Sequence, residues 1–324
     1  MSKDPIGLFG RMNALSLMLI TPEFYNVRRL RAKNASKIDY IPAKFTMQLE
    51  HMQLDDLSIR YARAGKADGP TILFLSPLPQ SILCYDAVWA NLASEANLIA
   101  VDMPGFGKSE GGMEYMTFAA QSAFLEKFVT ALELSDIHIV APDVAMPVAL
   151  HYVMHRDHKA KSIAIGDGPG ILPSDDGSLI RKVVGYGFWR TLVNTTGMST
   201  FIAGATYLGY LHYSPKVAEV TDYMEAYAGR ARQVTSWFKS YPEATKEIDP
   251  SLDTLDVPVQ VFWGDQDAFL TTDNAKRLHA RLPKSALTIF ENCGHFCYQD
   301  KSDEFSNMLA SWVNGGHQFD KTDG

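Results

Sequence analysis

Short apolar runs that end at Gly, Pro or Asp recur along most of the chain. They lie at residues 71–75, 98–101, 137–140, 162–165, 259–262 and 286–290. Runs of this length predict buried β-strands. Between them, residues 115–134 and 145–155 place apolar side chains at helical spacing. Strands that alternate with helices predict an α/β fold, in which helices flank a mostly parallel central sheet.

The alternation stops once, between residues 168 and 250. This stretch is rich in Tyr, Trp, Phe and Gly, and it contains several helical segments but no clear strand. We expect it to form a helical cap over the carboxyl edge of the sheet, where such folds bind ligands. The predicted organisation is an N-terminal extension (1–45), the first part of the core (46–167), the cap (168–250) and the second part of the core (251–324).

The N-terminal extension combines an apolar run, 12–20, with five positive charges in 27–37. One interpretation is a surface-binding helix that makes a weak contact with a membrane or a partner. The other is an arm packed on the body with its basic side in water, and the short apolar face favours it. The run is too short to span a membrane, and no small-residue cleavage site follows it, so we predict no signal peptide.

Composition narrows the functional classes. The chain has 324 residues, of which 46% are hydrophobic and 21% are charged, as is typical of an enzyme-sized globular protein. Its 30 basic and 37 acidic residues leave a net charge of −7, which disfavours nucleic-acid binding. Its three cysteines do not form a disulfide framework, and we expect a cytoplasmic protein. The sequence leaves the oligomeric state open.

The segment 139–147 carries the main candidate for chemistry. It reads as a strand, a tight turn and a helix, with Asp143 at the tip of the turn. In the G-x-S-x-G elbow, glycines flank an exposed nucleophile at such a turn. Ala141 and Ala145 take the flanking positions here, and alanine is the next-smallest choice. The alternative is that Asp143 only caps the helix N-terminus.

Three further motifs appear in a defined order. They are D-x-P-G-F-G-x-S at 102–109, G-x-x-D at 264–267 after a late strand, and G-H at 294–295. With the elbow, they resemble the α/β-hydrolase superfamily over about residues 45–315. An aspartate at the elbow resembles the branch that contains epoxide hydrolases and haloalkane dehalogenases.

This resemblance implies a role for each candidate. Asp143 would attack a saturated carbon and form an alkyl ester, which water would then hydrolyse. His295 would activate the water, and Asp267 would orient its imidazole ring. Asp167, which follows another strand, is the second candidate for the acid. The alternatives are that Asp267 closes a turn and that His295 is a core histidine.

The resemblance also implies an oxyanion site made by backbone N–H groups. Relatives carry H-G-x-P after the first central strand, whereas residues 76–79 read Ser-Pro-Leu-Pro. The expected donors are the N–H groups of Leu78 and Val144. Pro77 removes one donor and stiffens the turn, but both of these N–H groups are kept.

The expected leaving group follows from two residues that halide-releasing relatives have and this chain lacks. Relatives that release halide place Trp after the nucleophile and Asn in the H-G-x-P loop, where this chain has Val144 and Leu78. A halide without N–H donors would be desolvated without compensation. Epoxide opening instead needs an acid, which relatives supply from cap tyrosines. The expected cap holds Tyr186, Tyr207, Tyr210, Tyr213, Tyr223, Tyr227 and Tyr241. Tyr207, Tyr210 and Tyr213 share a spacing that would roughly align them on one helix face. The sequence does not choose among the seven, and Tyr207 and Tyr210 are named as candidates.

The leading hypothesis is therefore an epoxide hydrolase that uses no cofactor and acts on a small hydrophobic molecule. A non-hydrolytic lyase, isomerase or cyclase, with Asp143 and His295 as acid and base, is an alternative. A haloalkane dehalogenase and a catalytically silent binding protein are two others. Cys293 and Cys297 are too close in sequence to form a closed zinc site, and we predict no metal.

Overall fold

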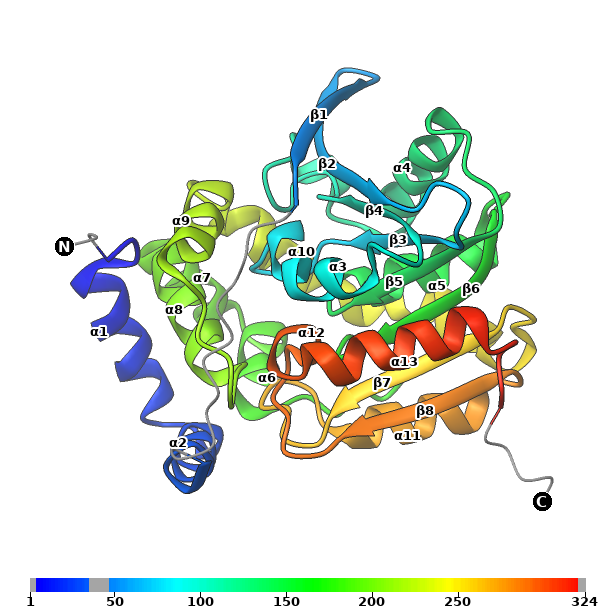
Figure 1. The fold of residues 1–324 in the computed structure, drawn as a ribbon. Coiled ribbons are helices and arrows are strands. Elements are labelled where there is room, and N and C mark those ends of the chain that lie inside the picture. Colours follow the sequence, from blue (N-terminus) through cyan, green and yellow to red (C-terminus); the bar gives the residue numbers. More distant parts are fainter. Residues whose placement is uncertain (1–3, 35–46, 320–324) are drawn as a thin grey trace.

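A central sheet of eight strands organises the molecule (Figure 1). The computed structural model describes residues 4–34 and 47–319. The strand order is β1-β2-β4-β3-β5-β6-β7-β8, with β1 and β2 antiparallel and the other six parallel. The bounds are β1 (Leu49–Leu54), β2 (Leu57–Gly65), β3 (Thr71–Leu75), β4 (Asn97–Val101), β5 (Ile137–Pro142), β6 (Ala160–Gly166), β7 (Val259–Gly264) and β8 (Ser285–Phe290). The six predicted strands and the mostly parallel sheet are thus confirmed.

Helices cover both faces of this sheet. α3 (Asp86–Leu92), α12 (Cys297–Asp300) and α13 (Ser302–Asn314) lie in front of it in Figure 1, and α4 (Phe118–Ala131), α5 (Ala145–His155) and α11 (Thr272–Arg281) lie behind it. Two apolar clusters follow the same division, because α3 and α13 contribute to one cluster and α4, α5 and α11 to the other. Short 3₁₀ helices lie at Ile82–Tyr85, Met113–Tyr115 and Asp249–Thr254.

Sequence reasoning missed the hairpin formed by β1 and β2. Leu49 pairs with Ala62 and Leu54 pairs with Leu57. β1 is an edge strand with its first three residues exposed, so it lacks the continuous apolar run of the buried strands. An edge strand such as β1 needs little apolar surface, so it can lack the continuous apolar run from which the other strands were predicted.

A helical insertion separates β6 from β7. It holds α6 (Ser178–Gly185), α7 (Gly187–Thr196), α8 (Met198–Leu208), α9 (Val217–Ala226) and α10 (Ala231–Ile248). Among the described residues, this insertion forms no named strand, and its one isolated β-bridge joins Asp176 to Leu270. The insertion lies beyond the carboxyl ends of the parallel strands (Figure 1).

Two N-terminal helices, α1 (Gly7–Met18) and α2 (Pro22–Asn34), pack on this insertion. The Arg31 guanidinium donates hydrogen bonds of 3.0 and 2.6 Å to the Tyr210 carbonyl oxygen, and Gly10 lies against Ser199 at the start of α8. Lys37 and the expected boundary at residue 45 lie outside the described residues. Among the helices of the described part, none has the length and apolar character that a bilayer span requires.

Candidate active site

Asp143 occupies a sharp turn between β5 and α5. Its backbone φ is 51°, in the left-handed region that residues other than glycine rarely adopt. The turn is close-packed, because a Cβ on Gly168 would lie 2.2 Å from the Asp143 carbonyl oxygen. The residue that caps α5 is Val144, and no side chain caps this helix. The helix-cap alternative therefore does not describe Asp143, and the turn has the form of a nucleophile elbow.

The Asp143 carboxylate is held between two groups. Its Oδ2 accepts a 2.8 Å hydrogen bond from the Leu78 N–H, one of the two predicted donors. Its Oδ1 lies 3.7 Å from Nε2 of His295, which is longer than a hydrogen bond. Val144, which carries the second predicted donor, lines the same pocket. The Leu78 N–H therefore orients the carboxylate, and its Oδ1 makes no hydrogen bond to the histidine.

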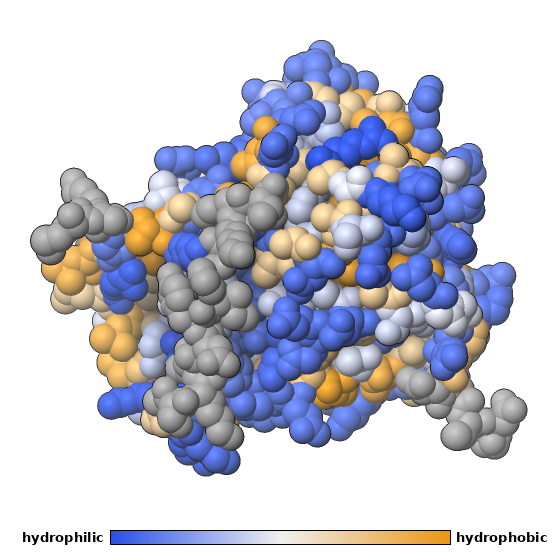
Figure 2. Space-filling model, viewed as in Figure 1, coloured by the Kyte–Doolittle hydropathy of each residue, from blue (hydrophilic) through white to orange (hydrophobic). Residues whose placement is uncertain are grey.

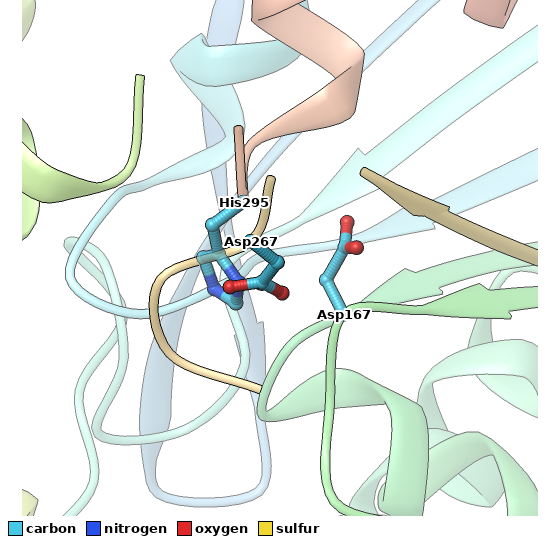
Figure 3. A group of neighbouring side chains, drawn as sticks. All are labelled: Asp167, Asp267 and His295. Atoms are coloured by element: carbon cyan, nitrogen blue, oxygen red, sulfur yellow. Dashed lines mark hydrogen bonds and ion pairs between the residues drawn. The ribbon is translucent and has the colours of Figure 1, made fainter. Parts of the chain in front are cut away.

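His295 is fixed by Asp267 rather than by Asp167. Asp267 Oδ2 lies 2.8 Å from the ring Nδ1 of His295. Oδ1 of Asp267 accepts hydrogen bonds from the backbone N–H groups of Phe269 (2.7 Å) and Leu270 (3.2 Å). Figure 3 shows how the Asp267 carboxylate meets the ring. These contacts leave the Nε2 edge of the ring directed to Asp143.

Asp167 lies beside this pair, fully buried (Figure 3). Its Oδ1 is 3.7 Å from Cys297 Sγ, and its Oδ2 has no hydrogen-bond partner. Burial raises the pKa of Asp167 well above its usual range, although the charge of His295 acts in the opposite direction. Asp167, Asp267 and His295 are close enough to ligate a cation. However, both Asp267 oxygens are already used in hydrogen bonds, which favours acid–base chemistry over metal binding.

The electrostatics of His295 are dominated by burial and by two carboxylates. Burial alone lowers the pKa of the imidazole, but the charges of Asp267 and Asp143 outweigh it and raise the pKa well above its usual range. Both carboxylate charges therefore favour the protonated form of the ring. Loss of either carboxylate charge brings the pKa down.

We expect Asp267→Asn to lower the pKa of His295, because it removes the strongest charge that raises it. The ring resonances of His295, followed by NMR against pH, measure the change. Because folding raises this pKa, the protonated histidine stabilises the wild-type fold at low pH, and that stabilisation is lost as pH rises through the raised value. In Asp267→Asn, the free energy of unfolding should therefore fall less as pH rises through this range. In the control Asp265→Asn the neighbouring carboxylate is removed, and the pKa should not change; an unchanged pKa in Asp267→Asn would contradict the assignment.

An apolar pocket opens onto Asp143 and His295. Its lining comes from α1, the sheet edge and the insertion: Ala14, Leu17, Met18, Leu78, Pro79, Asp143, Val144, Pro169, Leu179, Ile180, Val183, Val193, Thr200, Phe201, Gly204, Ala205, Trp237, Phe238, Tyr241, Phe269, Leu270, His295 and Phe296. Almost all of these side chains are apolar, as is usual for sites that bind small hydrophobic molecules.

The two tyrosines selected from the sequence do not line this pocket, and this corrects their selection. The Tyr207 ring stacks on Phe24 of α2, with centroids 5.3 Å apart. The buried Tyr210 hydroxyl donates a 2.6 Å hydrogen bond to Gln299. The predicted alignment failed because α8 ends at Leu208, so that Tyr210 lies beyond the helix.

The tyrosine that does line the pocket is Tyr241 of α10. Its hydroxyl donates a 2.6 Å hydrogen bond to Asp176 Oδ2. Burial and this carboxylate raise its pKa above the usual range. Tyr241 was among the seven cap tyrosines considered, but no local pattern separates it from the others. The contribution of α1 was also missed, because only packing brings residues 14, 17 and 18 to the site.

Comparison with known proteins identifies the family of the chain. The family model described as alpha/beta hydrolase fold matches residues 70–302. The chain belongs to the α/β-hydrolase family. An uncharacterized protein of Mycobacterium tuberculosis is 24% identical over 273 residues, covering 78% of this chain and 79% of its own. The monoacylglycerol lipase ABHD6 of Bos taurus is 22% identical over 296 residues, covering 85% of each chain.

Solved structures show the same fold. The haloalkane dehalogenase DbeA from Bradyrhizobium elkani superposes with a TM-score of 0.71 at 20% identity, covering 83% of this chain and 98% of its own. At this identity the likeness concerns the fold alone. The match to the family model over residues 70–302 indicates an enzyme of hydrolase type, whose substrate has to be argued from its own site.

Proposed function

We propose that this α/β-hydrolase opens epoxides that carry an apolar substituent, through an alkyl ester on Asp143. The observation that carries the proposal is the arrangement at the elbow. The Asp143 carboxylate lies in an apolar pocket, is oriented by the Leu78 N–H, and is 3.7 Å from a histidine that is paired with a second aspartate. A carboxylate suits attack on saturated carbon, whereas attack on a carboxylic ester would give a mixed anhydride.

The reaction has two steps. An Asp143 oxygen attacks an epoxide carbon, the ring C–O bond breaks, and the resulting alkoxide takes the proton of the Tyr241 hydroxyl to give a hydroxyalkyl ester. The protonated His295 then gives up its proton, which restores the Tyr241 hydroxyl and leaves a neutral imidazole. His295 then takes a proton from water, whose oxygen attacks the carboxyl carbon of the ester. The N–H groups of Leu78 and Val144 stabilise the tetrahedral oxyanion. The acyl C–O bond breaks, and the leaving alkoxide takes the proton of the added hydroxyl and departs as the diol. The Asp143 carboxylate and the protonated His295 are thereby restored.

The pKa of His295 follows this cycle. Before attack, the charge of Asp143 helps to raise it. The alkyl ester is neutral, so one cause of the raised pKa disappears when the intermediate forms. The imidazolium then gives up its proton more readily and becomes a general base when water has to be activated. Asp267 stays charged and keeps the ring oriented.

The polar groups of the pocket favour an epoxide over a halide. Tyr241 lines the pocket, and its hydroxyl, which a tyrosine keeps protonated at neutral pH, can protonate the alkoxide after turning from Asp176. A haloalkane is the second candidate substrate, because Trp237 lines the pocket and an indole N–H can bind a halide ion. Val144, in place of a tryptophan next to the nucleophile, leaves that halide site without a second indole.

The test is a His295→Gln variant, which keeps the nucleophile but lacks the base. Its turnover should fall by about 10²- to 10⁴-fold, and the ester should accumulate. The intact protein mass is recorded after exposure to a panel of epoxides and haloalkanes. We expect a gain equal to a whole epoxide, located at Asp143 by digestion. A gain equal to the haloalkane minus HX would instead establish dehalogenation.

Two further variants complete this experiment. Asp143→Asn combined with His295→Gln should give no adduct with any compound. Tyr241→Phe combined with His295→Gln should slow adduct formation from epoxides but not from haloalkanes, because only the epoxide oxygen needs the acid. No adduct in the single variant across the whole panel would contradict the ester mechanism and favour Asp143 as a base in non-hydrolytic chemistry.

A further inference from the structure

The outward face of α1 exposes a row of large apolar side chains. Leu8, Met12, Leu15 and Leu19 follow one another at intervals of four, three and four residues, which places them along one helix face. Leu8 is 75% exposed and Met12 is 59% exposed. Phe9 is 68% exposed beside them. Apolar surface gathers over this part of the molecule in Figure 2.

This concentration is unusual within the described residues. Six exposed large apolar side chains fall between residues 8 and 20, and the other seven are spread from residue 25 to residue 319. Single exposed apolar residues need no explanation, but a contiguous patch of them marks an interaction surface. The helix carries one charged residue, Arg11, and its guanidinium is paired with Asp4.

The opposite face of α1 belongs to the pocket. Ala14, Leu17 and Met18 line the cavity that holds Asp143 and His295. One helix therefore separates the exposed apolar patch from the apolar pocket. An apolar molecule that moves from the patch to the pocket would remain in contact with apolar side chains of α1.

The charged residues next to the patch are mainly basic. Residues 4–34 contain five basic and two acidic side chains, in a chain with net charge −7. Arg28, Arg29 and Lys33 of α2 are exposed. Of the two acids, Asp4 is paired with Arg11, and Glu23 accepts hydrogen bonds from Ser178. The free charge beside the patch is therefore positive, which complements anionic lipid headgroups.

We propose that α1 docks in the surface of a lipid layer containing anionic lipid, with Leu8, Phe9 and Met12 inserted and α2 against the headgroups. Such an interfacial helix needs no membrane span. It also places the pocket at the lipid surface, so apolar substrates reach Asp143 from the lipid phase. This second part rests on the proposed function, whereas the docking itself does not.

Vesicle flotation of the full chain, without substrate, tests the docking. The vesicles are pure phosphatidylcholine, or phosphatidylcholine with phosphatidylglycerol at a ratio of about 70 to 30. Wild type should float with the mixed vesicles. Leu8→Gln, Phe9→Gln and Met12→Gln together should lower its partition coefficient by at least about tenfold, because three inserted apolar side chains are lost. All three side chains are mostly exposed, so the melting temperature should not change.

A matched control uses the same three residue types elsewhere on the surface. Leu49→Gln, Met113→Gln and Phe319→Gln replace exposed side chains far from residue 20 in the sequence, and they should leave flotation within about twofold of wild type. Arg28→Gln, Arg29→Gln and Lys33→Gln together should remove the preference for the mixed vesicles over pure phosphatidylcholine. Added salt should do the same to wild type.

Three outcomes would overturn the proposal. They are no flotation of wild type with either vesicle, flotation that the triple variant of α1 does not lower, and a wild-type dimer in light scattering that this variant dissociates without any vesicle binding. The last would identify a second copy of the chain as the partner. Flotation is measured without turnover, so it can succeed or fail independently of the ester-trapping experiment.

Discussion

Replacing Asp143 with asparagine is expected to lower kcat by roughly 10⁴- to 10⁶-fold, the range seen when a covalent nucleophile is removed. The amide has no charged oxygen to attack carbon, so the ester cannot form. Asparagine is nevertheless suited to this position, because it tolerates the left-handed φ of 51° and can still accept the Leu78 N–H. The fold should therefore stay intact, and steady-state kinetics on the epoxide identified by trapping measure the loss.

The chain provides a matched control for this substitution. Asp136 also has a positive φ, 51°, but it is exposed and lies outside the pocket. Asp136→Asn should leave kcat within about twofold of wild type, in line with other surface substitutions. Turnover of Asp143→Asn within about tenfold of wild type, in protein whose mass excludes deamidation, would exclude Asp143 as the nucleophile.

Replacing Arg60 with methionine is expected to lower the free energy of unfolding by about 3–5 kcal/mol, the usual cost of breaking a buried charge network. Arg60 Nε lies 2.5 Å from Asp102 Oδ2, and its two terminal nitrogens donate to Asp222 at 2.7 and 3.0 Å. All three side chains are buried. Methionine fills similar space but leaves the two carboxylates without their shared counter-charge. Urea unfolding at 25 °C measures the difference.

This network joins the sheet to the helical insertion. Arg60 belongs to β2, Asp102 follows β4, and Asp222 belongs to α9. Lys127→Met, which breaks an exposed pair with Asp55, is the control and should leave unfolding unchanged. A loss below about 1 kcal/mol in Arg60→Met would mean that packing, rather than charge, holds the insertion here.

The same network explains the motif at 102–109, which the sequence presented only as a resemblance. Asp102 accepts hydrogen bonds from the backbone N–H groups of Ile82 (2.9 Å) and Lys108 (2.9 Å) in addition to Arg60. A Cβ on Gly107 would lie 2.0 Å from the Asp102 carboxyl carbon, so glycine is required there. The motif therefore builds the loop beside the site rather than supplying a reacting group.

Local pattern determined the central strands, the elbow and the order of its partners. Strands that are buried on both faces are mostly apolar, so β3 to β7 are visible in the sequence without knowledge of their neighbours. The edge strand β8 is visible because, unlike β1, it keeps an apolar run. Asp143 was identified because a strand, a tight turn and a helix follow one another within nine residues. Asp267 and His295 follow strands that end at the same edge of a parallel sheet, so their meeting could be expected.

Tertiary structure alone decided which groups face the pocket. Asp167 and Asp267 both follow strands that end beside His295, and only the turn at Phe269 and Leu270 directs Asp267 to the ring. Tyr241 reaches the pocket because α10 packs across it, while Tyr210 turns away once α8 has ended. The inner face of α1 joins the lining from the far end of the chain. The periodicity of apolar residues predicts which face of a helix or strand is apolar. Which segment that face contacts depends on packing between residues far apart in the sequence, and no local pattern contains this information.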